Sequence, residues 1–384
     1  MQLSRRSWLL AVLCVAGAWP ALSYAAEPGI AAVLQPFVDS HSLAGAVTLV
    51  ANKEKVLSLE AVGFADIAAK KPMQTDCVFW IASMSKPITG TALMILVDEG
   101  KVNVDDPVEK YLPEFRGQMV TAYQDDSTVL LKKPRHPITV KNVLSHTSGL
   151  PFKSAMEVPT LDVLPLRDAV RSYAMTPLMF EPDSKYQYSN AGINTAGRII
   201  EVVSGMSYEE FLDKRLFQPL GMQDTTFWPN EEQVSRLAKS YKPNADKTDL
   251  EEIKIGQLLY PLSDRTRRYP MPAGGYFSTA ADMGRFCQML LNGGTLDGKR
   301  YLSEAAVKQM TSKQTGDALK DGYGFGWSVG GTTFGHGGAH ATNMTVDPQR
   351  GLVTVWMIQH AGFPGDGGKA QGAFNQAAFE AFGK

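Results

Sequence analysis

The sequence has little of what marks several classes of protein. Three cysteines in 384 residues are too few for a domain held together by disulfides. The charges nearly cancel, with 38 Lys and Arg against 39 Asp and Glu, and no basic stripe is present. We therefore expect no nucleic-acid partner. The hydrophobic content of 44% is that of a globular chain, which excludes a disordered protein and a polytopic membrane protein.

The N-terminus has the three parts of a secretory signal peptide. Arg5 and Arg6 supply positive charge, and the apolar run from Trp8 to Trp19 is too short to cross a bilayer. A small residue, Ala25, then suits a cleavage site. We expect residues 1–25 to be removed, the mature protein to be periplasmic or secreted, and no stable membrane span to remain. Paired arginines are also typical of twin-arginine signals, so the export route stays open, as does an uncleaved anchor helix.

Removal of this segment leaves two cysteines, Cys77 and Cys287. An exported protein can form a disulfide. Two buried thiols are equally consistent with the sequence, so the pairing of these residues stays open.

Hydrophobic periodicity predicts strands towards both ends of the chain and helices between them. Helices are expected over residues 30–38, 83–100, 139–144, 192–203, 208–215, 279–291 and 370–382. Strands are expected over residues 44–50, 56–62, 323–329, 341–346 and 352–358, the first two as a hairpin. Residues 229–275 are polar and without a clear period, which indicates a long surface excursion.

This order predicts an α/β (α+β) fold class with two lobes in a single unit over residues 26–384. One lobe is built from about residues 27–82 and 300–384, and helices from both termini flank its antiparallel sheet. A mostly helical lobe of about residues 83–299 is inserted between these two segments.

Ser83 and Lys86 form a Ser-x-x-Lys motif at the start of a predicted helix. Residues three apart share a helix face, so the hydroxyl and the amine can meet. Desolvation can lower the pKa of a lysine enough for it to take the serine proton, and a helix N-terminus stabilises developing negative charge. The pair therefore supplies a nucleophile and a base. Ser83 also suits a helix N-cap, so the assignment depends on partners further along the chain.

Tyr188 and Asn190 are the first such partners, at a loop-to-helix junction. The phenol of Tyr188 can shuttle a proton, and the amide of Asn190 can hold both Lys86 and a substrate carbonyl. Taken alone, Tyr188 fits a packed aromatic side chain and Asn190 fits an N-cap equally well.

His336, Gly337 and Gly338 follow in a strand-rich segment. Two glycines on a strand let a ligand lie close to the backbone. The next N–H group, from Ala339, can complete an oxyanion hole. We therefore expect these four residues to line the substrate-binding side of the site.

In this order the three motifs resemble those of the serine β-lactamase and penicillin-binding protein superfamily. The chain is most similar to the class C β-lactamase-like branch, with its DD-peptidase and family VIII esterase relatives. Residues 144–150, 221–227 and 274–280 add to the resemblance, which covers about residues 28–384. It implies the β-lactamase/transpeptidase-like fold.

The resemblance also implies the chemistry. Ser83 attacks a carbonyl to form an acyl-enzyme, while Lys86 and Tyr188 handle the proton. The N–H groups of Ser83 and Ala339 hold the oxyanion, and Asn190 contacts the substrate. Neither a metal nor an organic cofactor is required.

The third motif departs from the typical β-lactamase pattern, because His336 stands where that family has a lysine. A neutral imidazole holds the carboxylate of a penicillin less well than a cation does. No arginine follows within residues 339–346, although the cluster at residues 265–268 can supply one from elsewhere.

We therefore expect an exported serine hydrolase for carboxylic esters with a small or medium acyl group. Two alternatives stay open. The first is a β-lactamase or D-Ala-type penicillin-binding peptidase, which acts on β-lactam or peptidoglycan-derived amides, and the second is a non-catalytic binding protein of the same fold. The expected partner is a small ester or amide, and the oligomeric state stays open.

Three other residues stand in weaker motifs. Ser328 lies in Gly-x-Ser-x-Gly, but no helix follows it as in a nucleophile elbow, so we expect a strand residue. His336 and His340 have a spacing found in zinc sites, but the glycines between them make a poor helix. His146 is expected to be a structural, hydrogen-bonding residue near a loop.

Overall fold

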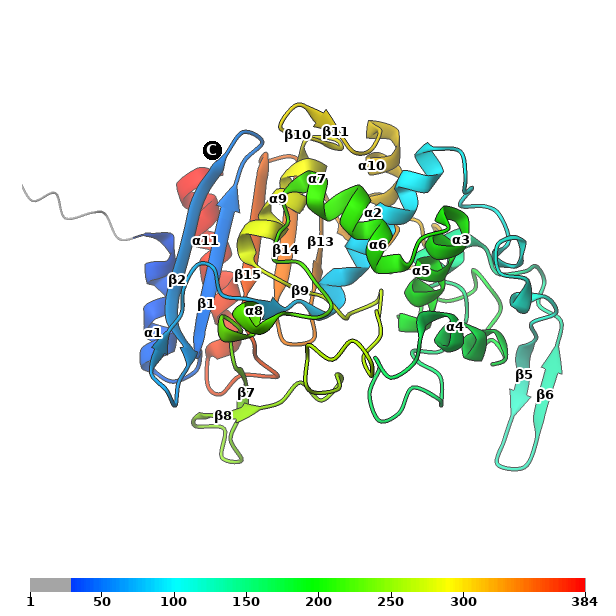
Figure 1. Cartoon of the computed structure of the whole chain (residues 1–384), viewed down its shortest axis with the longest axis horizontal. Coiled ribbons are helices and arrows are strands. Elements are labelled where there is room, and N and C mark those ends of the chain that lie inside the picture. Colours follow the sequence, from blue (N-terminus) through cyan, green and yellow to red (C-terminus); the bar gives the residue numbers. More distant parts are fainter. Residues whose placement is uncertain (1–28, 384) are drawn as a thin grey trace, which may run out of the picture.

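A large antiparallel sheet organises the computed structural model, which describes residues 29–383. Its strands are β1 (Gly45–Ala51), β2 (Val56–Asp66), β3 (Lys71–Pro72), β12 (Ser328–Gly330), β13 (Thr333–Gly337), β14 (Asn343–Asp347) and β15 (Leu352–Met357). They lie in the order β12-β13-β14-β15-β1-β2-β3 (Figure 1). Because β1 pairs with both β2 and β15, strands from both ends of the chain form one sheet, as predicted.

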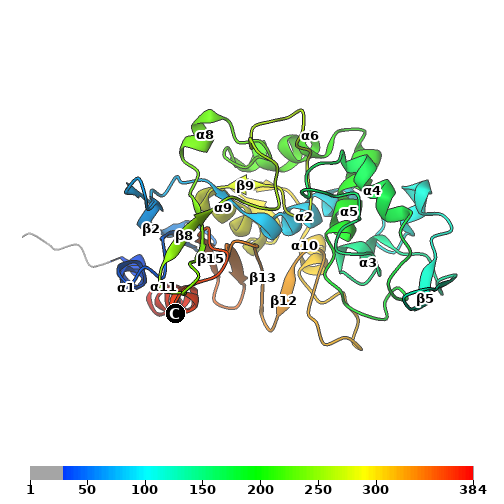
Figure 2. The same ribbon diagram turned by 90° about the horizontal axis from the view of Figure 1, so that it is seen from below.

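Helices cover both faces of this sheet, and all residues of β1 are therefore buried. One face carries η1 (Ile30–Leu34), α1 (Gln35–Asp39) and α11 (Ala370–Phe382), and the other carries α9 (Ala280–Leu291) (Figure 2). Successive strand residues point to opposite faces, so Val50 joins the core of Phe374 while Leu49 joins that of Met283. Helix α9 packs on the sheet although it falls in the range expected for the helical lobe. The lobe boundaries remain a prediction.

Helix α2 (Ser85–Asp98) runs through the middle of the other half of the molecule, after the 3-10 turn η2 (Ala82–Met84). Its residues 85–96 are all buried, as expected for a helix that is apolar on every side. It contacts α5 (Asn190–Ser204) and α10 (Glu304–Met310). Helix α5 in turn contacts α3 (Val140–Leu144), α4 (Leu166–Ala174) and α6 (Tyr208–Leu212), and α6 continues into η5 (Asp213–Phe217) and α7 (Gln218–Leu220). A Cβ on Gly90 would lie 2.1 Å from the carbonyl oxygen of Phe325, so α2 requires glycine there.

Small elements complete the described residues. Paired strands are β4 (Phe79–Trp80) with β9 (Phe277–Ser278), β5 (Val120–Gln124) with β6 (Val129–Lys132), β7 (Ser240–Pro243) with β8 (Leu250–Ile253), and β10 (Thr295–Leu296) with β11 (Lys299–Arg300). Short helices are η3 (Val108–Lys110), η4 (Pro113–Phe115), α8 (Glu231–Ser235) and η6 (Gly367–Lys369). The β5–β6 hairpin projects from the end of the molecule opposite β1 and β2 (Figure 1).

The strand predicted over residues 323–329 is wrong for most of its length. Only β12 is a strand, and residues 323–327 form a buried, irregular segment. Gly326 has a φ of 82° in this segment, and a Cβ there would lie 2.5 Å from the carbonyl oxygen of Lys86. The glycine thus lets the chain press against the start of α2, which a regular strand would not allow.

The prediction that residues 229–275 are a surface excursion is also wrong in part. Ile255 and Leu258 are buried with Trp80 in a small core of their own. Arg268 is 1% exposed and forms an ion pair with the buried Asp162, with 2.7 Å between Nε and Oδ2. This segment is anchored by scattered apolar residues and by ion pairs, which leave no periodic pattern in the sequence.

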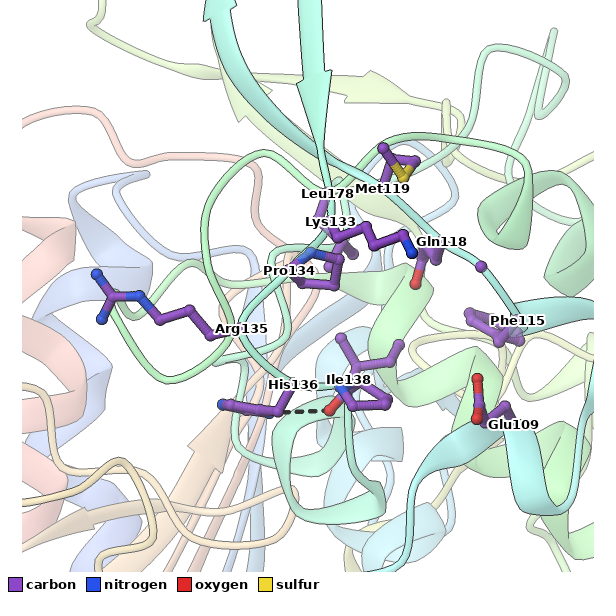
Figure 3. A pocket seen from close by; sticks show the side chains of 12 residues that line it. Glu109, Phe115, Gln118, Met119, Lys133, Pro134, Arg135, His136, Ile138 and Leu178 are labelled. Carbon is purple, nitrogen blue, oxygen red and sulfur yellow. Dashed lines mark hydrogen bonds between the residues drawn. The ribbon is translucent and has the colours of Figure 1, made fainter.

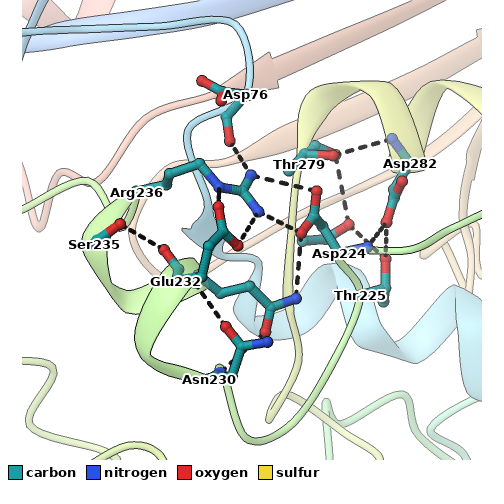
Figure 4. A network of polar contacts seen from close by, with 11 residues as sticks. Asp76, Asp224, Thr225, Asn230, Glu232, Ser235, Arg236, Thr279 and Asp282 are labelled. Carbon is teal, nitrogen blue, oxygen red and sulfur yellow. Dashed lines mark hydrogen bonds and ion pairs between the residues drawn. The ribbon is translucent and has the colours of Figure 1, made fainter.

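A polar network joins the residues around α8 to the start of α9 (Figure 4). Arg236 lies 2.6 Å from both Asp224 Oδ1 and Glu232 Oε1. Asp282, in the first turn of α9, accepts hydrogen bonds of 2.8 Å from the Asp224 N–H and the Thr225 hydroxyl. Burial raises the pKa of the Asp282 carboxyl to about 6.

Candidate active site

Ser83 lies in η2, immediately before α2. Its side chain is half-buried between buried neighbours. The preceding residue, Ala82, has a φ of 46°, a left-handed conformation that a residue with a side chain rarely adopts and that is often found at functional sites. Neither η2 nor α2 has a side-chain cap, so Ser83 is not the N-cap that the sequence also allowed.

Lys86 is fully buried and reaches back towards Ser83 along the same helix face. Its Nζ lies 3.0 Å from Ser83 Oγ and donates a hydrogen bond of 2.7 Å to the carbonyl oxygen of Ala273. It also lies 4.5 Å from the centre of the Tyr188 ring. Burial lowers the pKa of Lys86 well below its usual value, which favours the neutral amine that can accept a proton.

Tyr188 and Asn190 lie where a loop enters α5. The N-cap of this helix is Ser189, whose hydroxyl accepts a hydrogen bond from the Gly192 N–H, so Asn190 is not the cap. The Asn190 N–H donates to the carbonyl oxygen of Phe152, and its Oδ1 atom is buried without a hydrogen-bond partner among the described residues. That oxygen is therefore available to a ligand or to a rearranged Lys86.

The Tyr188 hydroxyl is held in its protonated form. Burial raises the pKa of Tyr188 well above its usual value, and a hydrogen bond with Ser83 offsets only part of that rise. A phenol in this state donates a proton more readily than a phenolate forms to accept one. Burial therefore has opposite consequences for the two groups: it favours an amine of Lys86 that can accept a proton and a phenol of Tyr188 that can donate one.

His336 is buried on β13 with both ring nitrogens occupied. Its Nδ1 lies 2.7 Å from the carbonyl oxygen of Gly337, and its Nε2 lies 2.9 Å from the hydroxyl of Tyr323. Because a carbonyl only accepts, Nδ1 carries the proton and Nε2 accepts from Tyr323. Burial lowers the pKa of His336 to about 3, so the ring is neutral at physiological pH.

The two glycines after His336 bring the end of β13 against the chain that leads to Ser83. A Cβ on Gly338 would lie 2.5 Å from the carbonyl oxygen of Ile81, which only glycine avoids. Ala339 is exposed in the turn that follows. The structure therefore brings the strand of His336 beside the turn of Ser83, as the predicted site requires.

Two aromatic residues at this site were not predicted to be part of it. The His146 ring centre lies 4.5 Å from those of both Tyr188 and Tyr323, and its Nδ1 accepts a hydrogen bond from the Ser189 N–H. The expected structural role of His146 is thus confirmed, but in the wall of the site. The sequence feature that pointed to His146 was its position within residues 144–150, a stretch that adds to the family resemblance. No sequence feature pointed to Tyr323, because it lies in an irregular segment and contacts His336 only through the fold.

The weaker motifs lie elsewhere. Ser328 is exposed on β12 and pairs with Gly335, as expected for a strand residue. His340 contacts Ser240 rather than His336, and the described residues contain no cluster of three or more metal-ligating side chains. Cys77 and Cys287 are buried free thiols.

A separate cavity of about 300 Å³ lies beside the β5–β6 hairpin (Figure 3). Phe115, Ile138 and Leu178 supply apolar walls, and Lys133 and Arg135 stand at its rim. None of the residues discussed above lines this cavity. It is therefore distinct from the candidate site.

The expected signal peptide, residues 1–25, lies outside the described residues. Between residues 29 and 383, no helix combines the length and the apolar character that a membrane crossing needs.

Comparison with known proteins identifies the family. The family model described as Beta-lactamase matches residues 30–378. Penicillin-binding protein 4 of Amycolatopsis lactamdurans is 31% identical over 73% of this chain and 72% of its own length. Esterase EstB of Burkholderia gladioli is 34% identical over 51% of this chain and 50% of its own length. The solved structure of EstCE1, described as a hydrolase with promiscuous acyltransferase activity, is 26% identical with a TM-score of 0.76, over 91% of this chain and 97% of that one. The chain therefore belongs to the β-lactamase family.

Proposed function

We propose that this protein is an exported serine hydrolase that forms an acyl-enzyme on Ser83 and acts best on carboxylic esters with small or medium acyl groups. One observation carries the proposal: the buried amine of Lys86 lies 3.0 Å from the Ser83 hydroxyl in surroundings that lower its pKa. A serine needs such a base to become a nucleophile. Export, to the periplasm or outside the cell, rests on residues 1–25.

The reaction proceeds in two halves. Ser83 Oγ attacks the ester carbonyl and its proton passes to Lys86, while the N–H groups of Ser83 and Ala339 hold the oxyanion. Tyr188 gives a proton to the leaving alcohol as the ester C–O bond breaks, and Lys86 restores that proton to Tyr188. Water then attacks the acyl-enzyme by the reverse path and releases the acid, while Asn190 contacts the bound acyl group.

The preference for esters rests on His336, which stands where a typical β-lactamase has a lysine. The imidazole is neutral and has no nitrogen left to bind a carboxylate. The arginine cluster at residues 265–268 is engaged elsewhere: Arg265 stacks on Trp228, Arg267 pairs with Asp264, and Arg268 is buried with Asp162. An uncharged substrate loses nothing by this arrangement, whereas a penicillin loses its carboxylate partner.

The relatives support the broad class and leave the substrate to experiment. Their printed names include a penicillin-binding protein, an esterase and a hydrolase with acyltransferase activity. An acyl-enzyme on Ser83 would also suit an amide substrate, so a β-lactamase or D-Ala-type peptidase remains the alternative.

The test is a paired assay on purified protein with a short-chain p-nitrophenyl ester and a chromogenic cephalosporin. We expect fast ester turnover and slow or no cephalosporin cleavage. Ser83→Ala should lower ester turnover at least about 10⁴-fold, because a nucleophile and its base act as a unit. Ser328→Ala is the matched control and should keep most activity.

Different results would contradict the proposed substrate, the proposed mechanism and the enzymatic activity itself. Faster cephalosporin than ester turnover would show that another residue holds the carboxylate and that the protein is a β-lactamase. An inactive but folded Ser328→Ala beside an active Ser83→Ala would overturn the mechanism. Equal, negligible turnover of wild type and Ser83→Ala on both substrates would favour a binding protein.

A further inference from the structure

A chain of hydrogen bonds leads away from Lys86 into the helical part of the molecule. Lys86 Nζ donates to the carbonyl oxygen of Ala273, and the Ala273 N–H donates to Asn194 Oδ1 over 3.0 Å. Asn194 Nδ2 donates to the Tyr173 hydroxyl over 3.0 Å, and that hydroxyl donates to Glu157 Oε1 over 2.8 Å. Every link donates in the same direction, from the amine towards the carboxylate.

The chain is closed to solvent. Asn194, Tyr173 and Glu157 are each at most 2% exposed. A buried carboxyl is costly unless it is hydrogen-bonded, and an apolar side chain would fill the same space more cheaply. The carboxyl of Glu157 is stabilised by Tyr173 and by the Ser154 N–H, at 2.7 Å from Oε2. Because hydrogen bonds are directional, these buried polar groups fix the positions of their partners, which apolar packing alone would not do.

The chain of hydrogen bonds fixes the position of Ala273. A neutral lysine has two N–H bonds and one lone pair. When the Ala273 carbonyl accepts one N–H, the amine can no longer rotate freely, and its lone pair is left for the hydroxyl of Ser83. A misplacement of about 1 Å in a reacting group can cost about 100-fold in rate. The rate of proton transfer thus depends on what holds Ala273.

The same carboxylate also anchors a loop on the other side of the site. Glu157 binds the N–H of Ser154, and in the same loop the carbonyl oxygen of Phe152 accepts the hydrogen bond from Asn190. Glu157 is therefore connected to the site by two routes, one through Lys86 and one through Asn190.

We propose that Asn194, Tyr173 and Glu157 are positioning residues for Lys86, which hold the Ala273 carbonyl where it orients the amine towards Ser83. The proposal rests on the acyl-enzyme function above. None of the three touches the reacting atoms, and each acts on Lys86 through the backbone of Ala273.

The experiment removes one hydroxyl from the chain. In Tyr173→Phe, Asn194 Nδ2 loses its acceptor and Glu157 loses a donor, while the ring still fills its space. We expect kcat/KM for the p-nitrophenyl ester to fall about 10-fold or more, through a slower burst of acylation with KM nearly unchanged. The acid limb of the pH profile should shift as well, because the surroundings of Lys86 change.

Tyr111→Phe is the matched control, since Tyr111 also donates to a carboxylate, that of Asp106, outside this chain. It should leave both the kinetics and the pH profile unchanged. Glu157→Gln serves as the second variant if Tyr173→Phe does not fold. It keeps an acceptor oxygen for Tyr173, so we expect kcat/KM to fall below that of wild type by a smaller factor than for Tyr173→Phe, and wild-type kcat/KM would count against the inference. The other ionisable groups near Lys86 are Tyr188, His146 and His336, and none of the variants in this experiment replaces any of them.

A folded Tyr173→Phe with wild-type acylation rate and pH profile would overturn the inference. Ser83→Ala separates this failure from that of the proposed function. If Ser83→Ala is inactive while Tyr173→Phe is normal, only the positioning role is wrong. If Ser83→Ala is active, the acyl-enzyme function itself is wrong.

Discussion

At the scale of the residue, the site is built from ionisable groups that burial keeps neutral. Burial lowers the pKa values of Lys86, His146 and His336 and raises those of Tyr188 and Tyr323. Burial thus disfavours the charged form of an amine, two imidazoles and two phenols that lie together. Such surroundings suit an uncharged ester better than an anionic substrate.

The buried lysine predicts the pH dependence of acylation. In the proposed mechanism Lys86 acts as the neutral base, so kcat/KM should fall as pH decreases through the pKa of Lys86. Because the pKa of Lys86 is well below its usual value of about 10.4, kcat/KM should stay at its maximum from about pH 10 far into the acid range. The titration of His336 should cause no further change in kcat/KM above about pH 5. Ester hydrolysis measured from about pH 5 to about pH 10 checks this. A limb near the ordinary lysine pKa would show that Lys86 is solvated or is not the base.

The proximity of Ser83 and Lys86 could be predicted because a spacing of three residues has a direct physical meaning. Ser83 and Lys86 lie three apart on one helix, and the structure places their reacting atoms 3.0 Å apart. Tyr323 could not be predicted, because its contact with His336 crosses an irregular segment where side-chain spacing has no period. Ala273 could not be predicted either, since it acts through its backbone and any residue type offers a carbonyl.

At the scale of the element, α9 begins with a carboxylate that is out of water. Asp282 lies in its first turn, where a negative charge is normally favourable. Burial outweighs that effect and raises the pKa of Asp282 to about 6. The folded state therefore binds a proton at a pH where the unfolded chain has released it.

This shift predicts that stability is lost as pH rises. The contribution of Asp282 is fully present below about pH 4 and is lost as pH rises through about 6, a change of about 3 kcal/mol in the free energy of unfolding. Asp282→Asn should remove this dependence, because the amide keeps an acceptor oxygen and does not ionise. Urea unfolding of both proteins across this range checks it. Parallel curves for the two proteins would contradict the assignment.

The elements that periodicity predicted are those with an uninterrupted apolar face. The β1–β2 hairpin, α5, α9 and α11 all match their predicted ranges closely. Strand β13 was not delimited, because Gly335 and Gly337 replace the alternating apolar residues that mark a strand. A Cβ on Gly335 would lie 2.3 Å from the carbonyl oxygen of Met344 on β14, so the close approach of the two strands requires a residue type that carries no strand signal.

At the scale of the whole molecule, a fully buried ion pair is one of the contacts that hold residues 229–275 against the rest of the chain. Arg268 and Asp162 are both about 1% exposed and lie far apart in the sequence. Removing one partner leaves the other buried and unpaired, so Arg268→Ala should lower the free energy of unfolding by about 3–5 kcal/mol. The double variant Arg268→Met with Asp162→Asn should lose much less than the sum of its parts. Denaturant unfolding measures both, and additive losses would show that the pair does not act as a unit.

The sheet formed by both ends of the chain could be predicted from the order of strands and helices, whereas the packing of residues 229–275 could not. Order along the chain decides which segments return to the same sheet. A buried ion pair such as Arg268 with Asp162 looks in sequence like any two surface charges, because nothing local distinguishes it.

Because β1 pairs with β15, the large sheet can form only after β15 has been synthesised. Its partner β15 leaves the ribosome roughly 300 residues later, and at about 5–20 residues per second β1 waits on the order of 15–60 s for it. During that time the nascent β1–β2 hairpin presents an apolar, unpaired edge of the kind that promotes aggregation. A stop codon anywhere before the end of β15 leaves the sheet without its centre, however much of the chain precedes it.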